Sequence, residues 1–305
     1  MLRSLNQHCA NAHIYVLCMD EQTESILNAL NMPNVSCIAL TEIEDEALLK
    51  AKKTRSVAEY CWTLSPCLPW YIMNHYPEVD FITYVDADLL FYSSLQPLIN
   101  EIGDSSIAII EHRFPTHYKH LEVNGRFCVE WVSFRRDEQG MVCLTRWREQ
   151  CIEWCFYRLE DERMGDQKYL DQWPNLYSRL HILQHLGAGV APWNYSQYNF
   201  RCDAQGAITV DSVPLIFYHF HQFQLLANGS FDRLSDSYRA IQPEPEPIYE
   251  TYEIILRGLL NEIRALSPGF SAGLKPVLRI KSQRLVQYLL PQFIKQWLKK
   301  IIKAV

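Results

Sequence analysis

Two acidic residues, Asp86 and Asp88, interrupt an apolar run in the segment "FITYVDADLLFY" at residues 81–92. The residues before them are typical of a β-strand, and Leu89 and Leu90 continue the apolar run. An ionised carboxylate is costly to bury unless it is paired or bound to a metal. Mg²⁺ and Mn²⁺ bind protein carboxylates together with phosphate oxygens and water. The pattern therefore predicts a strand end that holds a divalent cation, although capping acids in a solvated turn would give the same short motif.

Apolar runs alternate with helical patterns along most of the chain. We expect strands at 12–20, 35–40, 81–86, 105–112, 128–136, 179–187 and 213–221, and helices at 21–31, 41–76 and 141–159. This alternation predicts an α/β fold with a mostly parallel central sheet flanked by helices. In such sheets, ligands bind beyond the carboxyl ends of the strands. Asp20, Asp86, Asp88 and His219 fall at strand ends, so we expect them to converge.

Composition and charge restrict the class of protein. The 305 residues are 48% hydrophobic and 21% charged, as in a globular protein with a sizeable core. A Pro/Glu-rich joint at 242–250 predicts a catalytic domain at 1–240 and a C-terminal helical segment at 241–305. Eight basic residues and no acid follow position 274. The formal net charge of the chain is −6, so residues 1–274 alone carry −6 − 8 = −14. A body this acidic argues against nucleic acid as a partner.

The ten cysteines show no metal-type pairing beyond Cys151 and Cys155, which are four residues apart. We therefore expect free thiols in a reducing compartment. The start of the chain lacks the long apolar run of a signal peptide, and no window approaches the roughly 18–20 apolar residues of a spanning helix. These features predict a cytoplasmic protein.

Five blocks in a fixed order carry a family resemblance: "TYVDADLLFYSSLQPL", "VEWVSFRRD", "ERMGDQKYLDQWP", "LQHLGAGVAPWN" and "PLIFYHFH". Over roughly residues 10–225 this order resembles retaining glycosyltransferases of family 8, which have the GT-A fold and use nucleotide-sugar donors. The resemblance implies that Asp86 and Asp88 bind Mn²⁺ (or Mg²⁺) on the donor diphosphate. It assigns the third ligand to His219, with His221 as the fallback.

The resemblance also implies a catalytic pair, Asp166 and Gln167, beside the donor sugar. A transferase of this kind needs a group that tolerates an oxocarbenium-like centre and a group that orients sugar hydroxyls. We expect Asp166 to bind a sugar hydroxyl and Gln167 to face the anomeric carbon. Asp166 also suits the N-cap of a following helix, and the two roles are compatible.

Further donor-binding candidates follow from the same alignment of blocks, and several depart from the family pattern. The first strand of that pattern is expected to be missing. "CVEW" places a thiol and a carboxylate where an Asn-x-(Ser/Gly) strand would face the sugar, and "HFHQFQL" lacks the Gly and Lys that contact the diphosphate. The glycines of "LGAG" either let the backbone approach the donor or form a turn. The candidates are Asp20, Arg55, Cys128, Glu130, Gly187 and Gly189.

The C-terminal end, residues 290–305, places apolar and Lys-rich positions on opposite sides of a helical pattern. This arrangement predicts either binding to an anionic membrane surface, on the inner face of the membrane, or a helix packed on the catalytic domain.

Together these features predict a metal-dependent retaining glycosyltransferase. It would move a hexose from a nucleotide-sugar, UDP-linked in our reading, to a glycan or glycolipid acceptor such as a lipopolysaccharide. The alternative is a catalytically degenerate GT-A-fold protein that binds a nucleotide-sugar or a partner enzyme. A phosphatase with a D-x-D nucleophile is a poorer match, because its downstream Thr and Lys partners are not found.

Overall fold

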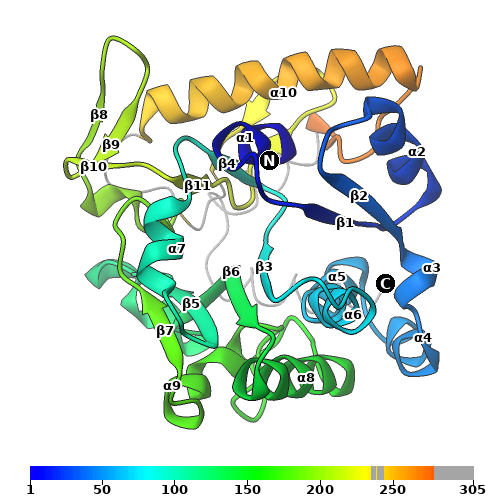
Figure 1. Ribbon diagram of the computed structural model, residues 1–305. Coiled ribbons are helices and arrows are strands. Elements are labelled where there is room, and N and C mark those ends of the chain that lie inside the picture. Colours follow the sequence, from blue (N-terminus) through cyan, green and yellow to red (C-terminus); the bar gives the residue numbers. More distant parts are fainter. Residues whose placement is uncertain (235–237, 239–243, 278–305) are drawn as a thin grey trace, which may run out of the picture. The chain divides into compact units, whose positions relative to one another are not determined.

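The computed structural model describes residues 1–234, 238 and 244–277 (Figure 1). It contains two compact units, one made of Met1–His221 with Ala240–Ile255 and the other of Gln222–Arg239 with Leu256–Val305. The predicted division at residues 240/241 stays a prediction. The basic end at 290–305 lies outside the described residues.

Strands of the first unit match the expected positions. They are β1 (Ile14–Cys18), β2 (Val35–Ala39), β3 (Phe81–Val85), β4 (Leu89–Phe91), β5 (Ile107–Glu111), β6 (Phe127–Arg135), β7 (Leu180–Leu183), β8 (Phe200–Cys202), β9 (Ile208–Val210), β10 (Val213–Pro214) and β11 (Phe217–His219). Each predicted strand overlaps an observed one. Short strands β4, β8 and β9 were not predicted, because three residues are too few to show a period.

Helices connect most of these strands. They are α1 (Leu2–His8), α2 (Glu21–Leu30), α3 (Leu40–Ile43), α4 (Glu46–Lys52), α5 (Val57–Leu64), α6 (Cys67–His75), α7 (Gln96–Ile102), α8 (Glu138–Glu153) and α9 (Trp173–Leu176), with 3₁₀ helices η1 (Thr116–Asn124), η2 (Lys168–Gln172) and η3 (Tyr195–Gln197). The long helix α10 (Glu246–Leu266) begins in the first unit and ends in the second.

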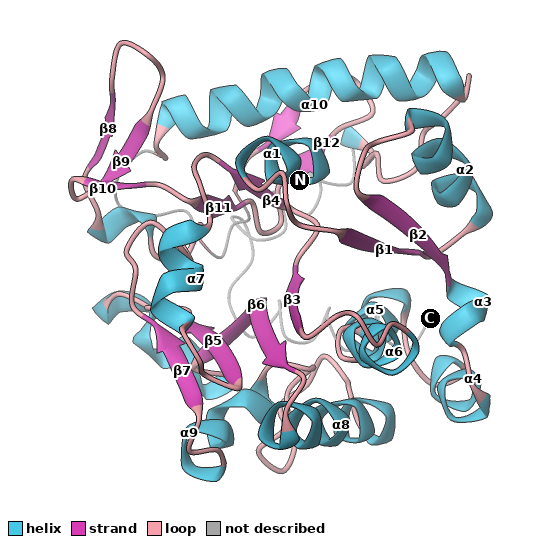
Figure 2. Ribbon diagram, viewed as in Figure 1, coloured by secondary structure: helices cyan, strands magenta, loops and turns pink. Residues whose placement is uncertain are grey.

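The central sheet has the order β3-β6-β5-β7, and Figure 2 shows β6 between β3 and β5. The expected mixed α/β class, with helices flanking a central sheet, is confirmed. The expected mostly parallel direction is confirmed: β3, β5 and β7 run in the same direction, and β6 alone of the four strands runs antiparallel to its neighbours. A parallel return usually requires an α-helical crossover, whereas residues 112–126 between β5 and β6 contain only the 3₁₀ helix η1. The pair β1 and β2 is parallel.

Side chains of α8 fill the core against the central sheet. The helix buries Cys143, Leu144, Trp147 and Cys151, a spacing of three and four residues that forms one face. Trp147 packs against the rings of Phe134 and Trp173, at centroid distances of 6.0 and 5.6 Å. Asp137 is the N-cap residue of this helix, and its side chain accepts from the Gly140 backbone N–H at 2.9 Å.

The second unit contains the antiparallel pair of β12 (Gln224–Leu225) and β13 (Phe231–Asp232). The guanidinium of Arg257 lies 4.5 Å from the ring centroid of Phe231 and donates to the Gly229 carbonyl. Within the described part of the chain, no helix combines the length and apolar character needed to cross a bilayer. All ten cysteines are free, as expected.

Two helical glycines provide a matched test of the packing between α8 and the sheet. A Cβ at Gly140 would collide with the Arg135 carbonyl oxygen and lie 3.0 Å from that of Ser106, whereas a Cβ at Gly258 in α10 would meet no atom within 4 Å. We expect Gly140→Ala to lower the free energy of unfolding by about 1–3 kcal/mol, because the overpacked backbone must shift. Gly258→Ala should raise it by up to ~1 kcal/mol, because alanine favours the helix. Denaturant unfolding measures both, and equal stabilisation by the two variants would contradict this packing.

Candidate metal and donor site

Three distant segments meet where β3 ends. Asp86 follows β3 directly, and Asp88 precedes β4 by one residue. Strand β11 pairs antiparallel with β4, which places His219 opposite Leu89. The backbone confirms this register, since the N–H of Phe220 donates to the Asp88 carbonyl at 3.0 Å. The pairing of β4 and β11 thus brings His219 beside two acids more than 130 residues earlier in the chain.

The side chains of these residues converge. Atom Nε2 of His219 lies 3.1 Å from Asp88 Oδ1 and 3.7 Å from Asp86 Oδ2. Atom Nδ1, on the other side of the ring, lies 2.7 Å from Oε2 of Glu130, which is on β6. His219 and Glu130 are buried, and Asp86 and Asp88 are more accessible. One imidazole therefore contacts three carboxylates. We call Asp86, Asp88, Glu130 and His219 the carboxylate–histidine cluster.

Burial and mutual charge shift the pKa values of this group. Burial raises the pKa of Asp86 to about 6, and the Asp88 charge adds to this rise while His219 opposes it. For Asp88 burial also acts to raise the pKa, but the positive charge of His219 brings it below its usual value. Burial acts to lower the pKa of His219, yet Asp88 and the other acceptors hold it well above the usual range. The cluster therefore favours positive charge at its centre.

This donor set fits a divalent cation. Two carboxylates and an imidazole nitrogen are ligands that Mn²⁺ accepts, and carboxylates also suit Mg²⁺. One ligand atom from each of Asp88, His219 and His221 lies within 4.8 Å of the others. Burial, with the neighbouring His219 charge, lowers the pKa of His221 to about 4, so its ring is neutral at pH 7. The fallback ligand His221 thus lies beside Asp88 and His219.

Cys128 lies on the Glu130 side of His219. Ligand atoms of Cys128, Glu130 and His219 also lie within 4.8 Å of one another. Burial, with the Glu130 charge, raises the pKa of the Cys128 thiol. Cys128 is therefore a buried thiol beside His219 and Glu130.

Asp166 is linked to the cluster through two hydroxyl groups. The Tyr84 hydroxyl donates to Asp86 Oδ1 at 2.9 Å, and Ser65 Oγ donates to the Tyr84 hydroxyl at 3.3 Å. Burial raises the pKa of Asp166 to about 7; a hydrogen bond from Ser65 opposes this rise, and the Asp86 charge adds to it. Its backbone carbonyl accepts from Trp147 Nε1 at 2.9 Å. Asp166 is thus held near Asp86 and titrates near neutrality.

Gln167 is the N-cap residue of η2, without a capping side-chain bond. Its Nε2 instead donates to the Asn124 carbonyl at 2.9 Å, at the end of η1. A Cβ at Gly125 would lie 3.2 Å from Cγ of Gln167. The amide is therefore packed against the loop that leads into β6.

Asp20 and Arg55 have structural contacts elsewhere. Asp20 is the exposed N-cap of α2 and accepts from the Thr23 N–H at 2.7 Å. Arg55 donates to the Cys151 and Ile152 carbonyls at 3.4 and 3.0 Å, where it satisfies the C-terminal end of α8. Across the described ranges we find no contact that joins either residue to the carboxylate–histidine cluster, and their predicted donor roles stay predictions.

The two candidate glycines permit close packing near the cluster. A Cβ at Gly187 would collide with the Pro214 carbonyl oxygen. Gly189 has a φ of +68°, and its Cβ would lie 2.7 Å from Ile110 Cδ1 and 3.2 Å from Glu130 Oε1. Only glycine adopts this conformation without strain and leaves space for Glu130.

Residues that the sequence did not single out also surround the site. Trp193 meets the rings of His219 and His221 edge to face, at centroid distances of 5.2 and 5.3 Å. Tyr84 could have been found from the sequence, because residues two apart in a strand share a face. Ser65 and Trp193 carried no such signal, since their positions depend on how α5 and the 189–194 loop pack.

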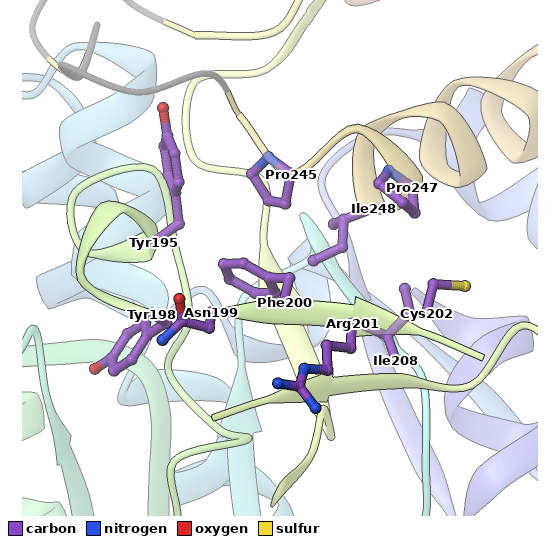
Figure 3. Close-up of a pocket in the computed structure, with 10 residues that line it drawn as sticks. All are labelled: Tyr195, Tyr198, Asn199, Phe200, Arg201, Cys202, Ile208, Pro245, Pro247 and Ile248. Carbon is purple, nitrogen blue, oxygen red and sulfur yellow. The ribbon is translucent and has the colours of Figure 1, made fainter. Parts of the chain in front are cut away.

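A pocket of about 310 Å³ is lined by none of these cluster residues. Figure 3 shows side chains of β8 and the preceding loop facing those at the start of α10. Its walls include Tyr198, Phe200 and Arg201, opposite Pro245 and Ile248. The pocket is therefore separate from the candidate metal ligands.

Comparison with known proteins found no matching family model. The chain is 32% identical to the uncharacterised protein YfnD of Bacillus subtilis (strain 168) over 292 residues, which covers 94% of this chain and 93% of YfnD. It is 30% identical to the uncharacterised protein YfnF of the same organism over 278 residues, or 89% of this chain and 91% of YfnF.

Several solved structures show a more distant likeness. They include galactosyltransferase LgtC with donor and acceptor sugar analogues (14% identity, 72% of this chain and 81% of LgtC, TM-score 0.44). They also include glycosyltransferase GlyE of Streptococcus pneumoniae TIGR4 (14% identity, 86% of this chain and 59% of GlyE, TM-score 0.46). A third is mouse xyloside xylosyltransferase 1 (14% identity, 74% of this chain and 91% of that protein, TM-score 0.42). All three of these proteins are glycosyltransferases.

The raised pKa of Asp166 predicts a pH-dependent stability. Because the folded chain holds this proton to about pH 7 and an ordinary carboxyl releases it near 3.8, folding stability falls as pH rises through that interval. Asp166→Asn removes this penalty. Relative to the wild type, the variant should gain about 2–3 kcal/mol between pH 5 and pH 8, measured by denaturant unfolding with a chelator present. Exposed Asp104→Asn is the control, and a wild-type pH dependence in Asp166→Asn would contradict the buried, protonated state.

Proposed function

We propose that this chain, which belongs to the same family as YfnD and YfnF of Bacillus subtilis, is a metal-dependent retaining glycosyltransferase that uses a nucleotide-sugar. The observation that carries the proposal is the approach of His219 Nε2 to Asp88 and Asp86, at 3.1 and 3.7 Å. His219 is more than 130 residues from Asp86 and Asp88 in the sequence, so their contact results from the fold and not from local chain connectivity. Their convergence at the end of β3 supports a shared cation.

Asp86, Asp88 and His219 would hold Mn²⁺ or Mg²⁺, with His221 next to them. The ion would supply Lewis-acid stabilisation of the charge that builds on a leaving diphosphate. By holding the ion, these residues would offset the repulsion between their own carboxylates and the diphosphate. The expected donor is UDP-linked, and the expected acceptor is a cell-surface glycan or glycolipid.

Asp166 and Gln167 carry the proposed chemistry at the sugar. With a pKa of about 7, Asp166 keeps a proton at or below neutral pH and is able to donate to a sugar hydroxyl. Gln167 is a neutral amide and a poor nucleophile, so a covalent sugar intermediate on it is unfavourable. We therefore favour attack by the acceptor on the same face that the diphosphate leaves, with the diphosphate as base. A glycosyl adduct on Asp166 or Gln167 in mass spectra would exclude this route.

Removal of one metal ligand tests the proposal. We expect Mn²⁺ at 100 times its Kd to stabilise the wild type by about 2.7 kcal/mol, and Asp88→Asn and His219→Ala to lose most of this effect because they bind Mn²⁺ more weakly. UDP-hexose hydrolysis should require Mn²⁺ and fall at least ~10-fold in Asp88→Asn. Asp104→Asn, an exposed acid outside the cluster, is the matched control.

Other outcomes of that experiment have distinct meanings. Equal Mn²⁺ stabilisation of the wild type and Asp88→Asn would exclude the metal site. Binding of Mn²⁺ and UDP-sugars without turnover on any acceptor or water would instead favour the nucleotide-sugar-binding alternative. The absence of Gly and Lys after His219, in "HFHQFQL", favours that alternative.

The pattern of residues 290–305 supports a proposal of membrane binding, in which Lys side chains contact anionic lipid and the opposite apolar positions enter the interface. We expect the full chain to float with vesicles that contain anionic lipid, and a chain that ends at residue 289 to remain at the bottom of the gradient. Neutral vesicles are the control. Equal partitioning of the two chains would exclude a membrane role for this segment.

A further inference from the structure

Glu130 on β6 is a fully buried residue. It contacts Nδ1 of His219, whereas Asp86 and Asp88 face Nε2 of the same ring. Its Oε2 lies at hydrogen-bond distance from His219 Nδ1, 2.7 Å away, and the residue is 0% exposed. Its Oε1 is buried and has no hydrogen-bond partner among the described residues. A buried carboxylate is costly, so its retention here requires a compensating interaction. The His219 ring supplies that interaction.

The contact determines how the imidazole is oriented. An ionised Glu130 side chain only accepts, so it pairs at 2.7 Å with a His219 ring that carries a proton on Nδ1. Nε2 then points to Asp88 and Asp86, at 3.1 and 3.7 Å. A neutral imidazole with a proton on Nδ1 has its lone pair on Nε2, which is the atom that faces the two acids.

The backbone of Glu130 contacts Asp86, on the opposite side of the His219 ring from the Glu130 carboxylate. Its carbonyl accepts from the Asp86 N–H at 3.3 Å. The pairing register of β5 with β6 shifts here, from Ile109↔Val132 to Ile110↔Cys128, so residues 129–131 have no paired partner on β5. This irregularity places the Glu130 side chain under His219 while its carbonyl contacts Asp86, and such irregularities re-aim side chains next to functional sites.

We propose that Glu130 is a positioning residue, which orients His219 and raises the basicity of Nε2 so that this atom binds the divalent cation. The inference rests on the metal site of the proposed function. It assigns to Glu130 a role different from the contact with the donor sugar expected from its place in "CVEW". Carboxylate–histidine pairs of this kind tune metal ligands in proteins generally, and their loss costs about 10–100-fold in metal affinity.

Mn²⁺ titrations followed by the electron paramagnetic resonance signal of free Mn²⁺ test this role, at one pH throughout. We expect Glu130→Gln to weaken Mn²⁺ binding by about 10–100-fold, and the exposed Glu149→Gln on α8 to leave it unchanged. In a His219→Ala background, Glu130→Gln should cause no further loss, because Glu130 acts through His219. An unchanged affinity in Glu130→Gln, or the same loss with and without His219, would overturn the proposal.

A second measurement needs no metal. In the metal-free wild type with ¹⁵N-labelled histidine, we expect His219 Nδ1 to carry a slowly exchanging proton at low field, assigned by its loss in His219→Ala. A deprotonated Nδ1 would overturn the proposal even if Mn²⁺ binds. If the proton is present but the wild type binds no Mn²⁺, the proposed function fails, while the orientation of His219 by Glu130 stands.

Discussion

The structure depends on how a chain keeps three carboxylates around one buried imidazole. Asp86, Asp88 and Glu130 all contact His219 at 2.7–3.7 Å. Without a positive charge at the centre, burial and mutual repulsion would make this group expensive. The pKa values of His219 and Asp86 are both raised. The positive charge of His219 is therefore favoured, and the negative charge of Asp86 is disfavoured. A divalent cation would satisfy the same requirement in place of the proton.

Backbone pairing makes the cluster possible. The register of β4 with β11 places His219 beside the acids, and the irregular stretch of β6 places Glu130 beneath it. Gly189, with its φ of +68°, lets the neighbouring loop approach Glu130 where a side chain would intrude. These features are costly or unusual in isolation, and their presence together is explained by the requirements of one site.

The same site extends through hydroxyl groups toward Asp166. Tyr84 and Ser65 lie between this acid and Asp86, so the charge at the cation site affects the protonation of Asp166. A cation beside Asp86 would offset part of the charge that raises the pKa of Asp166. A metal bound at Asp86 would therefore be coupled to the proton on Asp166 through the hydroxyl groups of Tyr84 and Ser65.

The sequence by itself determined the class of fold, the positions of the longer strands and helices, and the candidates Asp86, Asp88 and His219, because apolar periodicity and strand-end polar residues are local patterns. Only the tertiary structure decided the antiparallel direction of β6, the place of Glu130 behind His219, and the contacts of Asp20 and Arg55 with helix ends. A local sequence pattern predicts which residues are buried. It does not predict strand register, or which nitrogen of the His219 ring a distant residue approaches. Those depend on which segments pair, and pairing is settled by the packing of the whole unit.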